Sequence, residues 1–275
     1  MRVALLQMTS SDDPSENLET VLSAMQRAKG ADLLATPEVT NCVSLSRHRQ
    51  VEVLHRQADD PFVAAVAASA AELNLPVLLG SIALKTGDAD GRFANRSVLI
   101  NGTGIIQAHY DKAHMFDVVV SEAERYRESE GYRPGERLVT ARLGEITLGL
   151  SVCYDLRFPT IYRRMAQAGA QVLTVPSAFS PTTGSAHWHV LLRARAIETG
   201  CFVLAPAQTG THRTARSRSR ETYGHSLVVS PWGEVLGDMG TEPGLCLYEL
   251  DITEVERARR RIPSLTLDRE LTGPR

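Results

Sequence analysis

The chain has 275 residues, of which 43% are hydrophobic and 23% are charged, an ordinary composition for a globular protein. Its formal net charge of −2 gives no general attraction to nucleic acid. No apolar run approaches the roughly 20 residues that a membrane-spanning helix needs. We therefore expect no nucleic-acid or membrane partner. The length allows one large domain or two of ordinary size.

Alternating strand and helix patterns begin at the first residues. Residues 2–8 predict a strand. The start of the chain is too short and too polar for a signal peptide. The next segment predicts a helix that Asp13 caps, with Pro14 at its first position and Glu16 completing a capping box. The elements that follow are predicted to be a buried strand at 32–38, a helix at 61–74, a strand at 76–84 and a hairpin at 96–112.

The second half of the chain continues this alternation. The predicted elements are strands at 146–153, 171–177, 201–208 and 244–251, a hairpin at 224–239, and helices at 159–170, 185–200 and 253–261. No linker rich in Gly, Pro or Ser divides the pattern, so we expect a single domain over residues 1–275, with 262–275 as a tail. Alternation with hairpins indicates an α/β fold in which helices cover mixed sheets.

Two sets of residues could suggest metal binding, but neither has the spacing of a metal site. The cysteines are scattered without a C-x-x-C pair, at positions 42, 153, 201 and 246. His109 and His114 flank Lys112 at a spacing that fits no strong ligand motif. We therefore expect reduced thiols in a cytoplasmic protein, with no metal and no cofactor.

Glu38, Lys112 and Cys153 each come directly after a predicted strand. Active-site groups of open α/β sheets collect at such strand ends. Each residue alone also has an ordinary interpretation, as a loop glutamate, a surface lysine or a thiol packed in the core. After Cys153 an apolar run changes abruptly to Tyr-Asp-Leu-Arg-Phe-Pro, which favours a strand-to-helix elbow whose N–H groups would stabilise a thiolate.

The combination of these residues with their local motifs is far more specific. The motifs T-P-E-V-T-N-C, Y-D-K-A-H-M-F-D-V and S-V-C-Y-D-L-R-F-P resemble those of the nitrilase, or carbon–nitrogen hydrolase, superfamily. The resemblance covers nearly the whole chain and is strongest to the branch assigned as deaminated glutathione amidases, although the related ω-amidases share much of the pattern. It implies a four-layer α-β-β-α sandwich with mixed sheets, assembled as a homodimer or higher homo-oligomer. Residues 261–271 would form either an arm that crosses to the partner or a frayed terminus.

The resemblance also implies hydrolysis of a linear amide through a cysteine thioester. Cys153 would attack the carbonyl carbon, while Glu38 would take the thiol proton and return it to the leaving amine. Lys112 and the backbone N–H of Tyr154 would stabilise the oxyanion.

Further residues are candidates for holding the substrate, which we expect to be a small anionic amide. Glu128, which fits better than Glu130 in the same loop, would position Lys112 and the substrate amide. Arg157 would either pair with a substrate carboxylate or tie the elbow to a neighbouring strand. Thr183 and His187 would form part of a pocket wall.

The favoured reaction converts deaminated glutathione into 2-oxoglutarate and cysteinylglycine. The alternatives are an ω-amidase acting on 2-oxoglutaramate, another carbon–nitrogen hydrolase such as a nitrilase or an N-carbamoyl amidohydrolase, and, more distantly, a non-catalytic binding scaffold. Residues 212–221 contain four arginines and would form either a solvated surface loop or a lid that attracts the anionic substrate.

Overall fold

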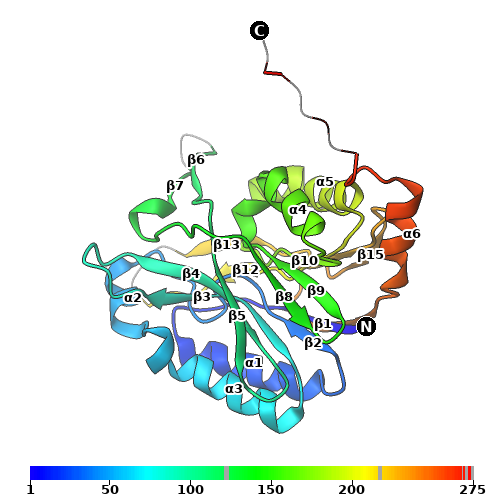
Figure 1. Cartoon of the computed structure of the whole chain (residues 1–275). Helices are drawn as coiled ribbons and strands as arrows, with labels where there is room; N and C mark the ends of the chain where they lie inside the picture. Colours follow the sequence, from blue (N-terminus) through cyan, green and yellow to red (C-terminus); the bar gives the residue numbers. More distant parts are fainter. Residues whose placement is uncertain (121–123, 216–218, 268, 270–271, 274–275) are drawn as a thin grey trace.

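The computed structural model describes the whole chain except residues 121–123, 216–218, 268, 270–271 and 274–275. Two six-stranded sheets pack against each other between two layers of helices (Figure 1). The outer layers contain α1 (Pro14–Arg27) and α3 (Pro61–Leu73) on one side, and α4 (Pro159–Gln167) and α5 (Pro181–Thr199) on the other. The predicted α/β fold, a four-layer α-β-β-α sandwich, is therefore confirmed.

The first sheet combines parallel and antiparallel pairs. Its strands are, in spatial order, β16 (Gly244–Glu249), β1 (Arg2–Gln7), β2 (Leu33–Ala35), β3 (Val77–Lys85), β4 (Phe93–Ile100) and β5 (Ile106–Asp111). Alternate residues of β1 serve its two faces: Val3 and Leu5 join the cluster between the sheets, while Ala4 and Leu6 pack with α1 and α3. Burial of one such leucine or valine stabilises the fold by roughly 1.5–3 kcal/mol.

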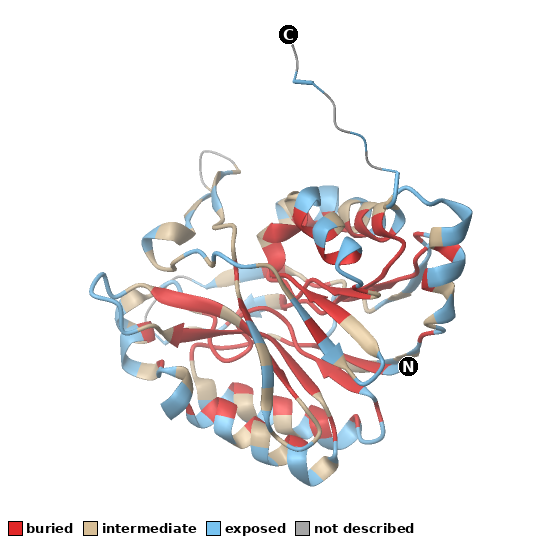
Figure 2. Ribbon diagram, in the orientation of Figure 1, coloured by how far each residue is buried: buried red, intermediate tan, exposed pale blue. Residues whose placement is uncertain are grey.

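The second sheet is also mixed. Its strands are, in spatial order, β15 (Val235–Asp238), β14 (Leu227–Val229), β11 (Phe202–Ala205), β10 (Val172–Thr174), β9 (Ile146–Leu150) and β8 (Val139–Leu143). Three neighbouring strands of this sheet, β9, β10 and β11, are parallel. Their residues are mostly buried, and Figure 2 shows buried residues along the central strands of both sheets. The edge strand β8 was not predicted, because its alternation of apolar and polar residues, V-T-A-R-L, is only five residues long and buries only Ala141.

The start of α5 and the capping box predicted for α1 differ from the sequence predictions. The helix α5 begins at Pro181, four residues before the predicted start, because the Ser180 side chain accepts a hydrogen bond from the Thr183 N–H and Pro181 fits the first position. At α1, Asp13 caps the helix as predicted. The predicted capping box is wrong, however, because the Glu16 carboxylate accepts a hydrogen bond from the Ser11 hydroxyl instead.

Short elements outside the sheets complete the fold. They are α2 (Arg47–Val53), α6 (Thr253–Arg261), the hairpin β6 (Asp117–Val119) with β7 (Arg125–Arg127), the hairpin β12 (Thr209–His212) with β13 (Arg220–Tyr223), and 3₁₀ helices at Gln57–Asp59, Glu128–Glu130 and Cys153–Arg157. The Arg-rich segment 212–221 therefore starts and ends within paired strands, which corrects the prediction of a loop throughout. Its central residues 216–218 lie outside the described part, so its role as a lid stays a prediction.

The segment that follows α6 is held against α4 at its start. The Arg163 and Gln167 side chains of α4 donate hydrogen bonds to the carbonyl oxygens of Ser264 and Leu265. Several residues of the predicted arm, 268 and 270–271, lie outside the described part, so a crossing to a partner stays a prediction. Within the described residues, no helix has the length and apolarity to cross a bilayer.

Candidate active site

Three strand ends bring Glu38, Lys112 and Cys153 together. Glu38 lies shortly after β2, Lys112 directly follows β5 in the same sheet, and Cys153 begins a 3₁₀ turn after β9 of the opposite sheet. The Lys112 Nζ lies 2.9 Å from the Glu38 Oε1, and Cys153 lies close enough to both groups for their charges to shift the pKa of its thiol. The three side chains are buried, so they interact in a site from which bulk water is largely excluded.

Glu128 supplies a second carboxylate to Lys112. The Lys112 Nζ donates to both Glu128 oxygens, at 2.9 and 2.8 Å, and the Phe116 N–H donates to the Oε2 atom at 2.7 Å. Glu130, the alternative in the same loop, is exposed and pairs with Arg127. The ammonium of Lys112 is only 2% exposed and lies between two carboxylates, which is how proteins accommodate a buried charge.

Asn95 is a member of the site that the sequence did not predict. Its Nδ2 donates to the Glu38 Oε1 at 2.9 Å and to the Glu128 Oε1 at 3.3 Å. The other Glu38 oxygen, Oε2, accepts the Ala178 N–H at 2.9 Å. The sequence did not predict Asn95 because this residue belongs to β4 and comes beside Lys112 only through the pairing of β4 with the end of β5. At that point the Lys112 N–H donates a hydrogen bond to the Asn95 carbonyl oxygen.

The charged forms of Glu38 and Lys112 stabilise each other. Burial raises the pKa of Glu38, but the Lys112 ammonium, the hydrogen bond from Cys153 and the Arg220 guanidinium lower it by more, so the pKa lies below its usual value. Burial lowers the pKa of Lys112, but Glu128 and Glu38 more than offset this effect and hold the pKa well above its usual value. Glu38 is therefore ionised and Lys112 protonated at neutral pH.

The Cys153 thiol differs from the sequence expectation. Burial raises its pKa, and the neighbouring Glu38 carboxylate raises it further, so the resting side chain is a neutral thiol. The lowering influence of Lys112 is outweighed. The predicted stabilisation of a thiolate by the elbow is thus wrong for the resting site, because burial between the sheets dominates over local N–H groups. A neutral thiol beside an ionised carboxylate is a nucleophile paired with its base.

Backbone strain occurs beside both reacting groups. Cys153 has φ +51° and Val39, directly after Glu38, has φ +46°, values that non-glycine residues rarely adopt. The Cys153 N–H donates to the Pro176 carbonyl oxygen at 2.9 Å, and the Val39 N–H donates to the Ser81 Oγ at 2.8 Å. These bonds hold the two turns in strained conformations that direct Glu38 and Cys153 toward each other.

Asp155 connects the Lys112 loop to the Cys153 elbow. Its fully buried carboxylate accepts hydrogen bonds from the Tyr110 hydroxyl at 2.8 Å, the Val152 N–H at 2.9 Å and the His114 N–H at 3.0 Å. The His114 Nδ1 lies 2.7 Å from the same carboxylate. His114 therefore belongs to the support of the site.

A cavity of about 210 Å³ opens onto these side chains. Its lining includes Glu38, Asn95, Lys112, Glu128 and Cys153, together with Tyr154, Thr183, Phe179, Arg127 and Arg220. No group in the described part of the chain accepts a hydrogen bond from the Tyr154 N–H, so this donor is available to a substrate oxygen.

Two residues that were predicted to contact the substrate, Arg157 and His187, do not line the cavity. The Arg157 guanidinium nitrogens lie 3.3 Å from the His187 Nδ1, on the outer side of the 3₁₀ turn against α5. Arg157 also stacks near the ring of Phe179, which itself lines the cavity. Contact of Arg157 or His187 with a substrate therefore stays a prediction.

Among the described residues, the arginines that line the cavity are Arg127 and Arg220, and Arg220 is the one that the Arg-rich segment 212–221 contributes. It extends from β13, and its Nη2 donates to the Ala178 carbonyl oxygen at 2.5 Å. Its Nε is buried and has no hydrogen-bond partner among the described residues. The sequence offered no way to choose Arg220 from the four arginines of its segment, because the choice depends on the β12–β13 pairing.

Comparison with known proteins agrees with the geometry. Residues 2–260 match the family model described as carbon-nitrogen hydrolase. The chain is 34% identical to the deaminated glutathione amidase of Yersinia enterocolitica, over 97% of this chain and 92% of that protein. It is 38% identical to the human protein of the same name, over 95% of this chain and 80% of that protein.

A solved structure has the same fold. The crystal structure of the Caenorhabditis elegans NitFhit protein superposes with a TM-score of 0.89 at 34% identity, over 98% of this chain. The present chain spans 65% of that solved chain, slightly less than two thirds of its length.

Proposed function

Because the chain belongs to the carbon–nitrogen hydrolase family and is an amidase, we propose that Glu38, Lys112 and Cys153 catalyse the hydrolysis of deaminated glutathione. The observation that carries this proposal is the buried contact of a neutral thiol with an ionised carboxylate, beside an ammonium, at the floor of a cavity. Such a set provides a nucleophile, a proton shuttle and an oxyanion donor.

The first half-reaction forms a thioester. The Cys153 sulfur attacks the amide carbonyl carbon while Glu38 takes the thiol proton. The carbonyl oxygen becomes negatively charged and receives hydrogen bonds from the Lys112 ammonium and the Tyr154 N–H. Collapse of this intermediate breaks the carbon–nitrogen bond, and Glu38 returns the proton to the nitrogen, so that cysteinylglycine leaves as a neutral amine before it is protonated in solution.

The second half-reaction hydrolyses the thioester. A water molecule attacks the thioester carbonyl while Glu38 accepts a proton from it. The same two donors stabilise the second oxyanion. When the carbon–sulfur bond breaks, the proton returns from Glu38 to the Cys153 sulfur, and 2-oxoglutarate is released. One water is consumed, and the site regains its resting protonation.

The cavity suits an anionic substrate. Apart from Lys112, which is bound by two carboxylates, its cationic lining residues are Arg127 and Arg220. Arg220 has a buried Nε without a partner in the described residues, and a guanidinium pairs well with a carboxylate. We therefore assign Arg220 to binding of a substrate carboxylate, whereas Arg157, which lies outside the cavity lining, is the alternative to be tested and Thr183 remains a candidate for a hydrogen bond to the substrate.

The substrate is tested by comparing kcat/KM for deaminated glutathione and 2-oxoglutaramate, with Cys153→Ala as the inactive control. We expect the higher value with deaminated glutathione. A higher value with 2-oxoglutaramate would identify an ω-amidase, and no turnover with amides, nitriles or carbamoyl compounds would favour a non-catalytic scaffold. Mass spectrometry of the trapped enzyme should find the acyl group on Cys153.

We also propose that the enzyme is a cytoplasmic homodimer that pairs through its α4 and α5 surface. The helix α5 exposes Val190 (67% exposed) and Ile197 (53% exposed), which is unusual for large apolar side chains facing water. The cytoplasmic location is supported by the four cysteines, which form no disulfide and so fit a reducing compartment. Light scattering of wild type and Val190→Asp tests the assembly: a dimer that is unchanged by the substitution would exclude this surface.

A further inference from the structure

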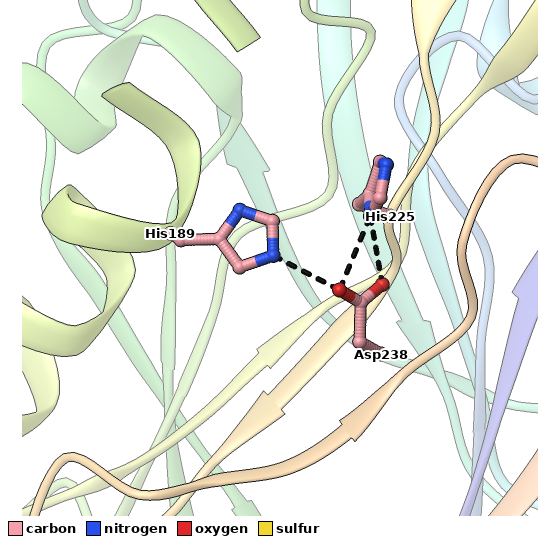
Figure 3. A group of neighbouring side chains, drawn as sticks. All are labelled: His189, His225 and Asp238. Carbon is pink, nitrogen blue, oxygen red and sulfur yellow. Dashed lines mark hydrogen bonds and ion pairs between the residues drawn. The ribbon is translucent and has the colours of Figure 1, made fainter. Parts of the chain in front are cut away.

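A cluster of two histidines and one aspartate lies outside the catalytic cavity. His189 comes from α5, His225 from the turn between β13 and β14, and Asp238 from the end of β15 (Figure 3). The His189 Nε2 lies 3.0 Å from the Asp238 Oδ2, and the His225 Nδ1 lies 2.9 Å from the Asp238 Oδ1. We propose that these three residues bind a divalent transition-metal ion, with Zn²⁺ as the ion to test.

The donor atoms have the separation and the chemistry of such a site. All three ligand atoms lie within 4.8 Å of one another. Zinc bonds of about 2.0–2.1 Å place tetrahedral ligand atoms about 3.3 Å apart, close to the two imidazole–carboxylate distances. Imidazole and carboxylate together are typical ligands of zinc and its neighbours in the periodic table.

The surroundings hold two of the ligands in place. The Asp238 Oδ1 accepts the Gly240 N–H at 2.9 Å, which orients the carboxylate. The His225 ring stacks on Tyr223 with 4.5 Å between ring centroids, and the His225 carbonyl oxygen accepts the Trp188 Nε1–H at 2.7 Å. Supporting contacts of this kind fix ligand orientation in metal sites.

The charge balance and the exposure also fit a metal ion. Among the described residues, the Asp238 carboxylate contacts the two imidazoles and pairs with no lysine or arginine. A divalent cation can therefore bind this carboxylate without displacing a lysine or an arginine. The three side chains are 23–35% exposed, which leaves a path for an ion and room for a water as fourth ligand.

The site would connect two parts of the fold. The first turn of α5 contains Thr183 and borders the catalytic cavity, whereas His189 lies further along the same helix. None of the three ligands lines the cavity. A bound ion would cross-link α5 to the β13–β14 turn and to β15, so binding stabilises the fold and the cavity wall without entering the reaction.

Zinc binding is measured by calorimetry and by metal analysis after gel filtration, in a Cys153→Ala background that removes the catalytic thiol as a competing ligand. We expect one ion per chain and a melting temperature that rises with Zn²⁺. His189→Gln and Asp238→Asn should each weaken binding by about 100-fold or more, since even supporting residues contribute 10- to 100-fold. The matched control His187→Gln, on the same helix, should leave the affinity unchanged.

The spectrum of the Co²⁺-loaded protein gives a second readout. Nitrogen and oxygen ligands give visible d–d bands without the thiolate-to-metal band that cysteine coordination produces. Circular dichroism of each variant verifies folding, and His189→Gln is the decisive change, because its side chain is partly exposed. Equal Zn²⁺ affinity in wild type, His189→Gln and Asp238→Asn, or no binding to wild type, would overturn the proposal.

Discussion

The Tyr110 hydroxyl donates a 2.8 Å hydrogen bond to the buried carboxylate of Asp155, and this contact joins the two sheets at the active site. Tyr110 lies two residues before Lys112 on β5, and Asp155 lies two residues after Cys153 in the elbow. The bond therefore helps to set the position of Lys112 relative to Cys153, although neither Tyr110 nor Asp155 lines the cavity.

Tyr110→Phe should lower kcat by about 10-fold or more with little change in KM, because a hydrogen bond to a charged group contributes about 1.5–3 kcal/mol. The matched control is Tyr162→Phe, since the Tyr162 hydroxyl is equally buried but bonds to Ser151. Steady-state kinetics of both variants distinguish the two positions. If both substitutions lower kcat equally, Tyr110 contributes only to stability and not to positioning.

Asn95 holds Glu38 and Glu128 through the two hydrogens of one amide, so its substitution should change the base. Asn95→Ala should reduce kcat/KM by about 10- to 100-fold, in proportion to the lost hydrogen bonds to charged groups. Asn95→Asp should lower kcat/KM further than Asn95→Ala does. It should also move the acid limb of the pH–rate profile to higher pH, because a third carboxylate raises the pKa of Glu38. An unchanged acid limb in Asn95→Asp would contradict this role.

The pH dependence follows from the lowered pKa of Glu38. Only the ionised carboxylate can take the thiol proton, so activity should be lost as the pH falls through a value below 4.5, the ordinary value for this group. Arg220→Gln removes one of the cations that lower this pKa, and the acid limb should move upward. The profile of kcat/KM against pH checks both expectations.

The same substitution tests substrate binding separately. Arg220→Gln should raise KM for an anionic amide and leave KM for a neutral amide nearly unchanged, because the lost contact is to the carboxylate. Arg157→Gln is the matched control, since Arg157 lies outside the cavity lining. A rise of KM in Arg157→Gln alone would place the carboxylate at the elbow instead.

Gly80 lies where the Glu38 loop approaches the segment that supports Cys153. A Cβ at this position would come within 1.8 Å of the Thr36 carbonyl oxygen and 2.5 Å of the Pro176 Cβ. Gly80→Ala should therefore force the backbones apart, with a loss of unfolding free energy of about 1–3 kcal/mol or more and a lower kcat. Urea unfolding and kinetics measure both. Gly244→Ala in β16, where a Cβ would meet only the Met239 Cε at 3.6 Å, should change stability much less.

Glu38, Lys112 and Cys153 could be predicted to act together because each follows a predicted strand and their local motifs in combination resemble those of the nitrilase superfamily. Asn95 and Arg220 could not, because their places depend on strand register between segments distant in the sequence. The start of α5 was missed for a different reason. Its first turn, P-T-T-G, has the composition of a loop, and only the Ser180–Pro181 pair carries the signal of a helix start.

The protonation state of Cys153 was also beyond the sequence. The sequence shows only that N–H groups of the elbow favour a thiolate, whereas the burial of the thiol between the sheets and the Glu38 charge both favour the neutral form. Both influences come from the packing of segments far apart in the chain. The three ligands His189, His225 and Asp238 are similarly contributed by three separate elements.

The neutral resting state of Cys153 has a consequence for the durability of the enzyme under oxidative stress. Peroxides oxidise thiolates much faster than thiols, and in the mechanism proposed above the sulfur ionises only while its proton passes to Glu38 during acylation. Peroxide should therefore oxidise Cys153 more slowly than free cysteine at the same pH, as mass spectrometry of the treated protein can measure. Faster oxidation would mean that the resting residue is a thiolate. Between turnovers, the nucleophile is protected by the same proton that it must give up to react.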